Sequence, residues 1–347
     1  MWKLTSPSKD LINWYEKKMC TSLVSRIKVS LDRRISKVLI PTLPTGGDDL
    51  SIVKRLLFEK PQKLYILNYK LMREIIPGYD ESEFNDYLES KGKKCNNRSN
   101  YDKLLIRKYH KTLITIRDAF DYEGQLAQNK SRTYRITFEQ GHNTCTYCNR
   151  QYTITITKDN GNNNESRIAR PQLDHWFSKE LYPLMSLSLY NLIPCCSICN
   201  SSLKGNTIFK LSTHVHPYLD STPDEPKFKF SYKLIDIEKC EVTIENLTDP
   251  KDRKEINMVE VFKLKEAYKY HGDIEVKDIL KYNYQYSDTY LQTLLDNLLE
   301  HYKLSKADVY RMLFGTELEA SKNLNRPLSK LKRDILTEIG ILKDGNF

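Results

Sequence analysis

Apolar residues recur every three or four positions through much of the first 120 residues, which is the spacing of one face of an amphipathic helix. This spacing predicts a first helix from Asp10 to Ile27. A break at 41–49 separates it from a second helical pattern running through Leu64 and Leu71. After a polar loop at 92–100, the same periodicity from Leu105 to Phe120 predicts a further helix.

The pattern changes in the middle of the chain. The segments TYRITF (133–138) and YTITIT (152–157) alternate apolar and polar residues and are rich in β-branched side chains, which favours half-buried strands. The polar run at 158–167 indicates a loop. Further on, KFKFSYKLI (227–235) and CEVTIENL (240–247) predict a pair of strands.

Helical periodicity returns after Pro250 and is clearest from Leu291 to Tyr302. Ser305 and Asp308 form a helix start signal, and the segment at 326–342 carries another helical stripe. The sequence therefore predicts an α+β protein that is mostly helical. We expect an N-terminal helical region (1–130), a central core (131–218) and a C-terminal region (219–347) with a short strand pair followed by helices.

Composition and charge bear on two classes of partner, nucleic acid and membrane. The 347 residues carry a formal net charge of +10, which raises the local concentration of polyanions such as nucleic acid or anionic membrane. From the charge alone, a nucleic-acid partner and the lack of one are about equally expected. No apolar run is long enough to span a bilayer, and the first residues lack the apolar core of a signal peptide. We therefore expect a cytoplasmic protein with no membrane partner.

Five of the eight cysteines lie in one part of the chain, and four of these form two C-x-x-C pairs, Cys145 with Cys148 and Cys196 with Cys199. Both thiolates of such a pair can reach one ion from a tight turn, so the spacing predicts a four-sulfur zinc site. Cys195 is an alternative to Cys196, but three residues would then separate the partners, and we favour Cys196. The competing interpretation is four unliganded core cysteines. Since four thiolates leave no position open for water, this zinc is expected to be structural.

Polar residues between and after the two pairs occur in a specific order: Asp174-His175, then Asn191 in YNLIP, then Asn200 followed by Lys204-Gly205. Together with the cysteine pairs, this order resembles the HNH endonucleases that carry the zinc-binding variant of the ββα-metal motif. The segment NLIPCCSICNSSLKG is most similar to the HNH components of Septu-type and retron-linked anti-phage defence systems. The resemblance covers about residues 142–218.

The resemblance implies a role for each matched residue. His175 would be the general base that activates water, in keeping with an imidazole whose ordinary pKa lies near neutrality. Asp174 and Asn200 would bind a catalytic Mg²⁺ or Mn²⁺ through oxygen. Asn191 would tie the loop between the strands so that His175 points at the scissile bond. Lys204 is a candidate phosphate contact, and the alternative is an exposed, solvated lysine.

The resemblance also implies a function: a metal-dependent endonuclease that hydrolyses phosphodiester bonds, with DNA favoured and tRNA as another substrate, acting in anti-phage defence with a partner ATPase. Considered alone, His175 would be a buried, hydrogen-bonded histidine. His142, His214 and His216 also lie near the motif, and for His216, in the segment HPY, we favour a structural role over one that faces the site. Two other functions stay open. One is a non-catalytic zinc module that binds nucleic acid, and the other is a scaffold whose zinc knuckle stabilises a surface for a protein partner.

Overall fold

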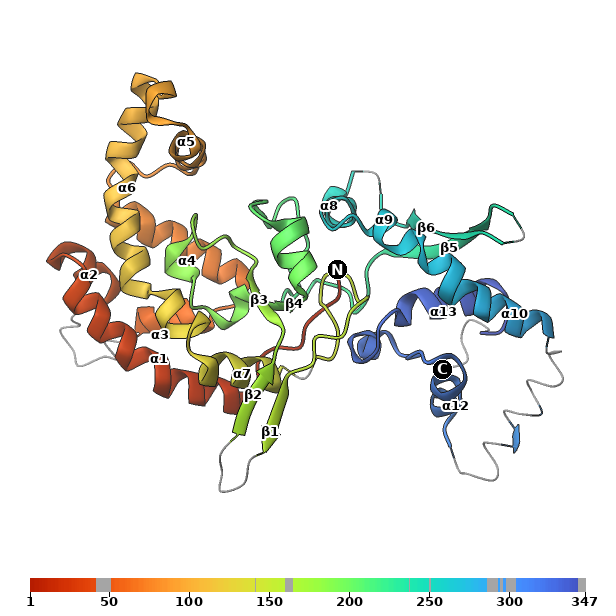
Figure 1. Ribbon diagram of the computed structural model, residues 1–347. Coiled ribbons are helices and arrows are strands. Elements are labelled where there is room, and N and C mark those ends of the chain that lie inside the picture. Colours follow the sequence, from red (N-terminus) through yellow and green to blue (C-terminus); the bar gives the residue numbers. More distant parts are fainter. Residues whose placement is uncertain are drawn as a thin grey trace. The chain divides into compact units, whose positions relative to one another are not determined.

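The computed structural model describes residues 1–41, 51–140, 142–159, 165–236, 238–249, 251–285, 293, 296–297 and 304–342. The protein belongs to the α+β class, is 57% helical and contains small two-stranded sheets, as the sequence predicts (Figure 1). Its contacts divide the chain into two compact units. Unit 1 comprises Met1–Leu4, Gly141–Gln172 and Pro194–Phe347, and unit 2 comprises Thr5–Gln140 and Leu173–Ile193. Each unit thus contains segments far apart in sequence, unlike the three consecutive regions expected above.

Unit 2 is largely helical. Its α-helices are α1 (Lys9–Ser30), α2 (Arg33–Leu39), α3 (Ser51–Phe58), α4 (Pro61–Ile75), α5 (Glu81–Gly92), α6 (Asn100–Phe120) and α7 (Lys130–Glu139), with a 3₁₀ turn η1 (Cys95–Asn97) and a π-helical segment η2 (Glu123–Ala127). The helices predicted from the apolar periodicity correspond to α1, α4 and α6 and are confirmed. Almost all of the predicted break at 41–49 lies outside the described residues.

Helix starts and the buried face explain why α6 forms where it does. The Ser99 side chain accepts a hydrogen bond from the Asp102 backbone N–H, and the Asp102 carboxylate accepts one from the Ser99 backbone, a reciprocal capping box. Tyr109 is fully buried on this helix and lies edge-on to Phe84 of α5, with ring centroids 5.3 Å apart. Burying each such ring removes a large apolar area from water and contributes roughly 2 to 3 kcal/mol.

The predicted strand at 133–138 is wrong, because these residues belong to the helix α7. The Asn129 side chain accepts a hydrogen bond from Arg132 N at 3.1 Å and so starts a helix. Thr133 and Thr137 lie four residues apart on the buried face, and Thr137 Oγ1 donates to Thr133 O at 3.0 Å. The β-branched residues therefore serve a helical face, and tertiary burial and the N-cap outweigh strand propensity.

Unit 1 combines short strands with helices. It contains β1 (Ile156–Asp159), β2 (Glu165–Ala169), β5 (Phe228–Leu234), β6 (Cys240–Asn246), α8 (Arg253–Val261), α9 (Leu264–Lys269), η6 (Gly272–Val276), α10 (Lys277–Gln285), α12 (Lys306–Phe314), η7 (Ala320–Asn325) and α13 (Ser329–Glu338). The antiparallel pair β5–β6 confirms the strands predicted at 227–247, and α12 and α13 confirm two C-terminal helices. Most of the helix predicted at 291–302 falls outside the described residues.

The prediction for residues 152–167 needs correction. Tyr152 makes only an isolated bridge to Thr144, and the strand β1 begins later, at Ile156. Part of the segment interpreted as a loop is strand, because β1 continues to Asp159 and pairs antiparallel with β2. The predicted alternation is therefore real, but the strand starts four residues later than expected.

The strands β3 (Gln172–His175) and β4 (Leu192–Cys195) form a two-stranded sheet. Each of these strands has its residues divided between the two units, because unit 1 ends at Gln172 and resumes at Pro194. The 3₁₀ turns η3 (Pro183–Met185) and η4 (Leu189–Asn191) lie between them in sequence, and a π-helical segment η5 (Ile198–Lys204) follows β4. In the part of the chain that the structure describes, no helix has both the length and the apolar character needed to cross a membrane.

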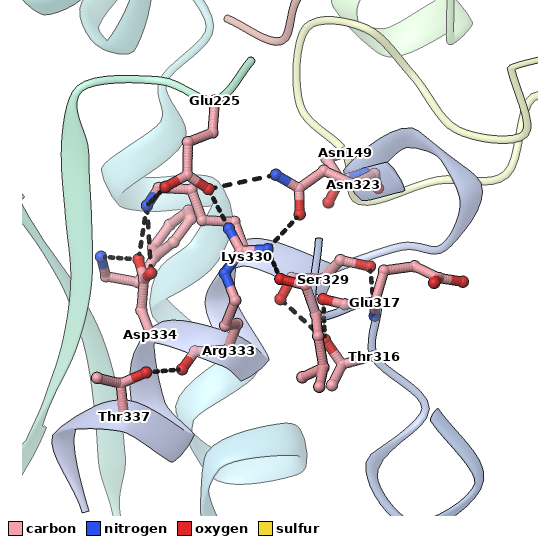
Figure 2. Close-up of polar contacts among 12 residues, drawn as sticks. Asn149, Glu225, Thr316, Glu317, Asn323, Ser329, Lys330, Arg333, Asp334 and Thr337 are labelled. Atoms are coloured by element: carbon pink, nitrogen blue, oxygen red, sulfur yellow. Dashed lines mark hydrogen bonds and ion pairs between the residues drawn. The ribbon is translucent and has the colours of Figure 1, made fainter. Parts of the chain in front are cut away.

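A buried polar network holds α13 within unit 1 (Figure 2). The Arg333 guanidinium donates to Asn323 Oδ1 at 3.0 Å and pairs with the Glu225 carboxylate. The next residue, Asp334, accepts a hydrogen bond through Oδ2 from the backbone N–H of Phe230 in β5 at 2.8 Å. Side chains of α13 thus bind both to β5 and to η7, the 3₁₀ segment that precedes α13.

Candidate functional site

The four cysteines of the two C-x-x-C pairs come together in unit 1. Cys145, Cys148, Cys196 and Cys199 are all buried, and their sulfur atoms all lie within 4.8 Å of one another. A tetrahedral zinc site with Zn–S bonds of about 2.3 Å places its sulfurs roughly 3.8 Å apart, so the four side chains are close enough to hold such an ion. Cys195 is not in the group, since its Sγ donates to Gln172 O at 3.8 Å.

Backbone hydrogen bonds shape both cysteine turns. Asn149 N donates to Cys145 O at 2.8 Å, and Asn149 itself has a φ of 49°, a left-handed conformation that asparagine tolerates better than most residues. Cys196 N donates to Cys145 Sγ at 3.3 Å, and Cys199 N donates to Cys196 Sγ at 3.4 Å. Amide donors of this kind stabilise sulfur that carries negative charge.

The chemistry of this cysteine cluster fits a divalent cation. Burial raises the pKa of the Cys145 thiol well above its ordinary value, because the thiolate form loses its hydration. Four buried thiolates would also repel one another. A zinc ion would offset both costs, which is why metal binding and folding are coupled in such sites. The structural-zinc prediction therefore agrees with the arrangement of the four sulfurs.

Aromatic and polar contacts support the first cysteine turn. Tyr147 stacks on Phe262, with ring centroids 4.3 Å apart, and the Tyr268 hydroxyl donates to Cys148 O at 2.5 Å. Asn149 Nδ2 donates to Asn323 O at 2.8 Å and so connects the turn to the network around α13 (Figure 2). Sequence reasoning missed these supporting residues, since nothing in their spacing indicates contact across more than 100 positions.

His175 ends the strand β3 and belongs to unit 2. Its side chain is 8% exposed, and its Nε2 lies 2.9 Å from the backbone oxygen of Ser186. A carbonyl oxygen can only accept, so Nε2 carries the hydrogen and Nδ1 is the basic nitrogen of the neutral ring. Asp174, the preceding residue, is also buried.

Asn191 makes the hydrogen bonds that fix the chain around His175. Its Oδ1 accepts from Phe177 N at 2.6 Å, and its Nδ2 donates to Phe177 O and to Met185 O, both at 3.0 Å. Phe177 lies two residues after His175, and Met185 immediately precedes Ser186, the residue whose carbonyl binds the imidazole. One fully buried amide thus ties together both segments that position the histidine.

Tyr122 is a contact of His175 that the sequence did not reveal. The two rings are nearly perpendicular, at 74°, with centroids 4.3 Å apart. The ammonium group of Lys179 lies 4.9 Å from the centroid of the Tyr122 ring and also pairs with Glu123 at 2.5 Å. Tyr122 stands at the start of the π-helical segment η2, a type of irregularity that is often found at functional sites but has no simple sequence signal.

Asn200 and Lys204 lie on η5 in unit 1. Asn200 Nδ2 donates to Gln172 Oε1 at 2.8 Å. The amide oxygen of Asn200 takes no part in that bond. Lys204 is only 5% exposed, and its ammonium group lies 5.0 Å from the centroid of the Phe209 ring. The alternative of an exposed, solvated lysine is therefore wrong, while the phosphate contact stays a prediction.

The three further histidines have structural surroundings. His214 stacks on Phe209 at 4.5 Å, and His216 is fully buried and accepts a hydrogen bond from Tyr218 N at 3.2 Å. Burial lowers the pKa of His142 to about 4. The contacts of His216 agree with its structural interpretation.

The structure brings the four cysteines together in unit 1 and places His175 and Asn191 together in unit 2. Asp174 belongs to unit 2 and Asn200 to unit 1, so their joint binding of a catalytic ion stays a prediction. Comparisons with protein-family models, with curated proteins and with solved structures found no match. The argument for a function therefore depends on the chemistry of these residues.

Proposed function

We propose that the protein is a metal-dependent endonuclease of the HNH type, which hydrolyses phosphodiester bonds in nucleic acid and prefers DNA. The observation that carries the proposal is the hydrogen bond from His175 Nε2 to the Ser186 carbonyl. It assigns the ring hydrogen to Nε2 and makes Nδ1 the proton acceptor. A general base in this form can take a proton from water near neutral pH.

The surroundings of His175 support a positioned base. Asn191 fixes Phe177 and Met185, and a base that is held in one orientation loses less entropy when it reacts. In the proposed reaction, Nδ1 takes a proton from water as the water oxygen bonds to phosphorus. The bond between phosphorus and the 3′ oxygen breaks and the departing oxygen takes up a proton from water, so that the products carry a 5′ phosphate and a 3′ hydroxyl.

Asp174 and Asn200 are the proposed ligands of the catalytic ion, since carboxylate and amide oxygens suit Mg²⁺ or Mn²⁺. When bound, a divalent ion would supply positive charge near the phosphate and the departing oxygen.

The zinc site would then have a purely structural role. Four cysteine ligands complete its coordination, and it would connect the turn at Cys145 with the turn that begins η5. Cys199 and Asn200 are neighbours in sequence, so order at the zinc would also fix the backbone of the proposed catalytic ligand. Lys204, on the same segment, is the proposed contact for a substrate phosphate.

Cleavage of supercoiled plasmid and of total tRNA tests the proposal. The zinc-loaded protein is assayed with and without Mg²⁺ or Mn²⁺ beside the His175→Ala variant, whose zinc content and folding are checked first. We expect metal-dependent cleavage that falls at least about 100-fold in the variant, the usual scale of a lost general base. Equal cleavage by both proteins would exclude His175 as the base.

The same assay separates the nuclease from the two non-catalytic functions. The proposed biological role is that of an effector in anti-phage defence, with an ATPase as partner that restrains or delivers the nuclease. If the protein binds nucleic acid without cutting it, the assay is repeated with each neighbouring gene product that forms a complex with it, the proposed ATPase among them. Binding without cleavage in that complex as well would favour the zinc module or the scaffold over the enzyme.

A further inference from the structure

Helix α6 in unit 2 carries a row of cations that the proposed chemistry does not use. Lys103, Arg107 and Lys111 are spaced four residues apart, and all three are exposed. At 100° per residue they span about 80° of the helix surface, centred opposite the face that buries Leu105 and Tyr109. We call these three side chains the α6 basic row.

Among the described residues, no hydrogen bond or ion pair engages the side chains of the α6 basic row. Other cations of this helical hairpin behave differently. Lys93 pairs with Asp102 at 2.8 Å, and Lys108 pairs with Glu83 on the side that faces α5. The described residues of the unit therefore do not neutralise the positive charge of the row.

The α6 basic row does not serve to pair with a nearby acidic residue of the same helix face. The next acidic residue toward the end of this face, Asp118, already pairs with Arg117 at 3.3 Å. Figure 1 shows that α6 is a long, straight helix with α5 beside its N-terminal half. Three aligned cations on a rigid helix present a fixed linear array of charge.

We propose that the α6 basic row binds the phosphate backbone of nucleic acid. The helix rises 1.5 Å per residue, so Lys103 and Lys111 are about 12 Å apart along its axis. One strand of a duplex has a phosphate about every 3.4 Å of its axis, and the row therefore matches three to four phosphates. Single strands offer the same chemical group. The inference rests on the proposed function for its biological sense, but its test requires no cleavage.

The test is the salt dependence of binding. A fluorescent mixed-sequence 30-bp DNA, the corresponding single strand and total tRNA are titrated with the full chain between about 50 and 200 mM NaCl, in a His175→Ala background. The row variant combines Lys103→Gln, Arg107→Gln and Lys111→Gln. Each lost phosphate contact lowers the slope of log K against log salt by about 0.9 on a duplex, so we expect the slope to fall by roughly 2 to 3.

A control with the same change in charge shows whether position matters. Lys18, Lys37 and Lys70 are exposed on α1, α2 and α4, and each is replaced by Gln in one triple variant. Circular dichroism and thermal midpoints establish that both variants fold. The proposal predicts that the row variant binds at least about tenfold more weakly at 100 mM salt, while the control stays within about threefold of the parent.

Several results would overturn the inference. They are a parent chain that binds none of the three polymers, a row variant with the parental slope, or equal losses in both variants. Cleavage is measured separately, in chains that keep His175. A parental slope together with intact cleavage by the row variant that keeps His175 would remove the row from substrate binding without refuting the nuclease, and would point to an acidic protein surface as the partner of the row. A reduced slope together with no cleavage by the parent chain that keeps His175 would support the row while refuting the proposed enzyme.

Discussion

Asn191 offers the sharpest test of how the histidine is held. The Asn191→Ala variant removes one amide that makes three hydrogen bonds, at 2.6, 3.0 and 3.0 Å, to backbone groups of Phe177 and Met185. The residue is fully buried, so these groups have no ready access to water. Each unsatisfied buried group costs about 1 kcal/mol or more. We therefore expect the free energy of unfolding to fall by about 3 kcal/mol.

Urea unfolding of the zinc-loaded protein at pH 7 measures this loss. Two of the three tryptophans, Trp14 and Trp176, lie in unit 2, so their fluorescence reports mainly on the unit that contains Asn191. Asn85→Ala is the matched control, because the Asn85 side chain makes one hydrogen bond, to Glu81 O at 2.9 Å on the same helix. We expect the control to lose about 1 kcal/mol or less.

The same variant should lose activity where it is still folded. Without the bonds from Asn191, the chain at Met185 is free to move, and the Ser186 carbonyl that fixes His175 Nε2 moves with it. We expect kcat to fall by at least about tenfold, a scale that corresponds to about 1.4 kcal/mol. A loss of stability no larger than that of Asn85→Ala would refute the positioning argument, whatever happens to the activity.

Three further predictions follow from single contacts. Elemental analysis should find one zinc ion per chain in the parent and in Cys195→Ser but none in Cys196→Ser, since only Cys196 belongs to the sulfur cluster. Tyr122→Leu should lower kcat by up to about tenfold and alter its pH profile, while Tyr122→Phe keeps the ring against the imidazole and stays near the parent, because such ring pairs contribute about 0.5 to 1.5 kcal/mol. An unchanged profile in the Leu variant would contradict that role. Burial lowers the pKa of His142 from its ordinary 6.5 to about 4. The contribution of the neutral His142 to the free energy of unfolding is therefore present above pH 6.5 and is lost as the pH falls toward 4. His142→Gln should therefore reduce the difference in urea midpoint between pH 7 and pH 4.5, and an equal difference in both proteins would refute this.

Local spacing in the sequence predicts the parts of the molecule that depend on local interactions. The apolar stripes predict α1 and α6, because the same residues form the buried faces of these helices, and the start signal at Ser305 and Asp308 predicts α12. The zinc ligands are equally local within each C-x-x-C pair. The choice of Cys196 over Cys195 followed from pair spacing alone, and the arrangement of the sulfurs agrees with it.

Features that depend on distant contacts could not be predicted in this way. The segment 133–138 has strand-like alternation, yet burial of Thr133 and Thr137 on one face makes it helical. Lys204 lies beside an aromatic ring five residues ahead, which no spacing rule distinguishes from a solvated position. The contact between Tyr122 and His175 joins residues more than 50 positions apart through the irregular start of η2.

The asparagine that follows the first cysteine pair explains why the metal centre and the C-terminal helix belong to one compact unit. Asn149 Nδ2 donates to Asn323 O at 2.8 Å, and Leu328 N donates to the Asn149 carbonyl at the same distance. Asn149 has the left-handed backbone noted above, and its own N–H closes the turn around Cys145. Zinc at the cysteine cluster would fix this turn, and the turn fixes the entrance to α13. Loss of the metal should therefore loosen α13 as well as the cysteine turns, and hydrogen exchange of α13 amides with and without a chelator would detect it.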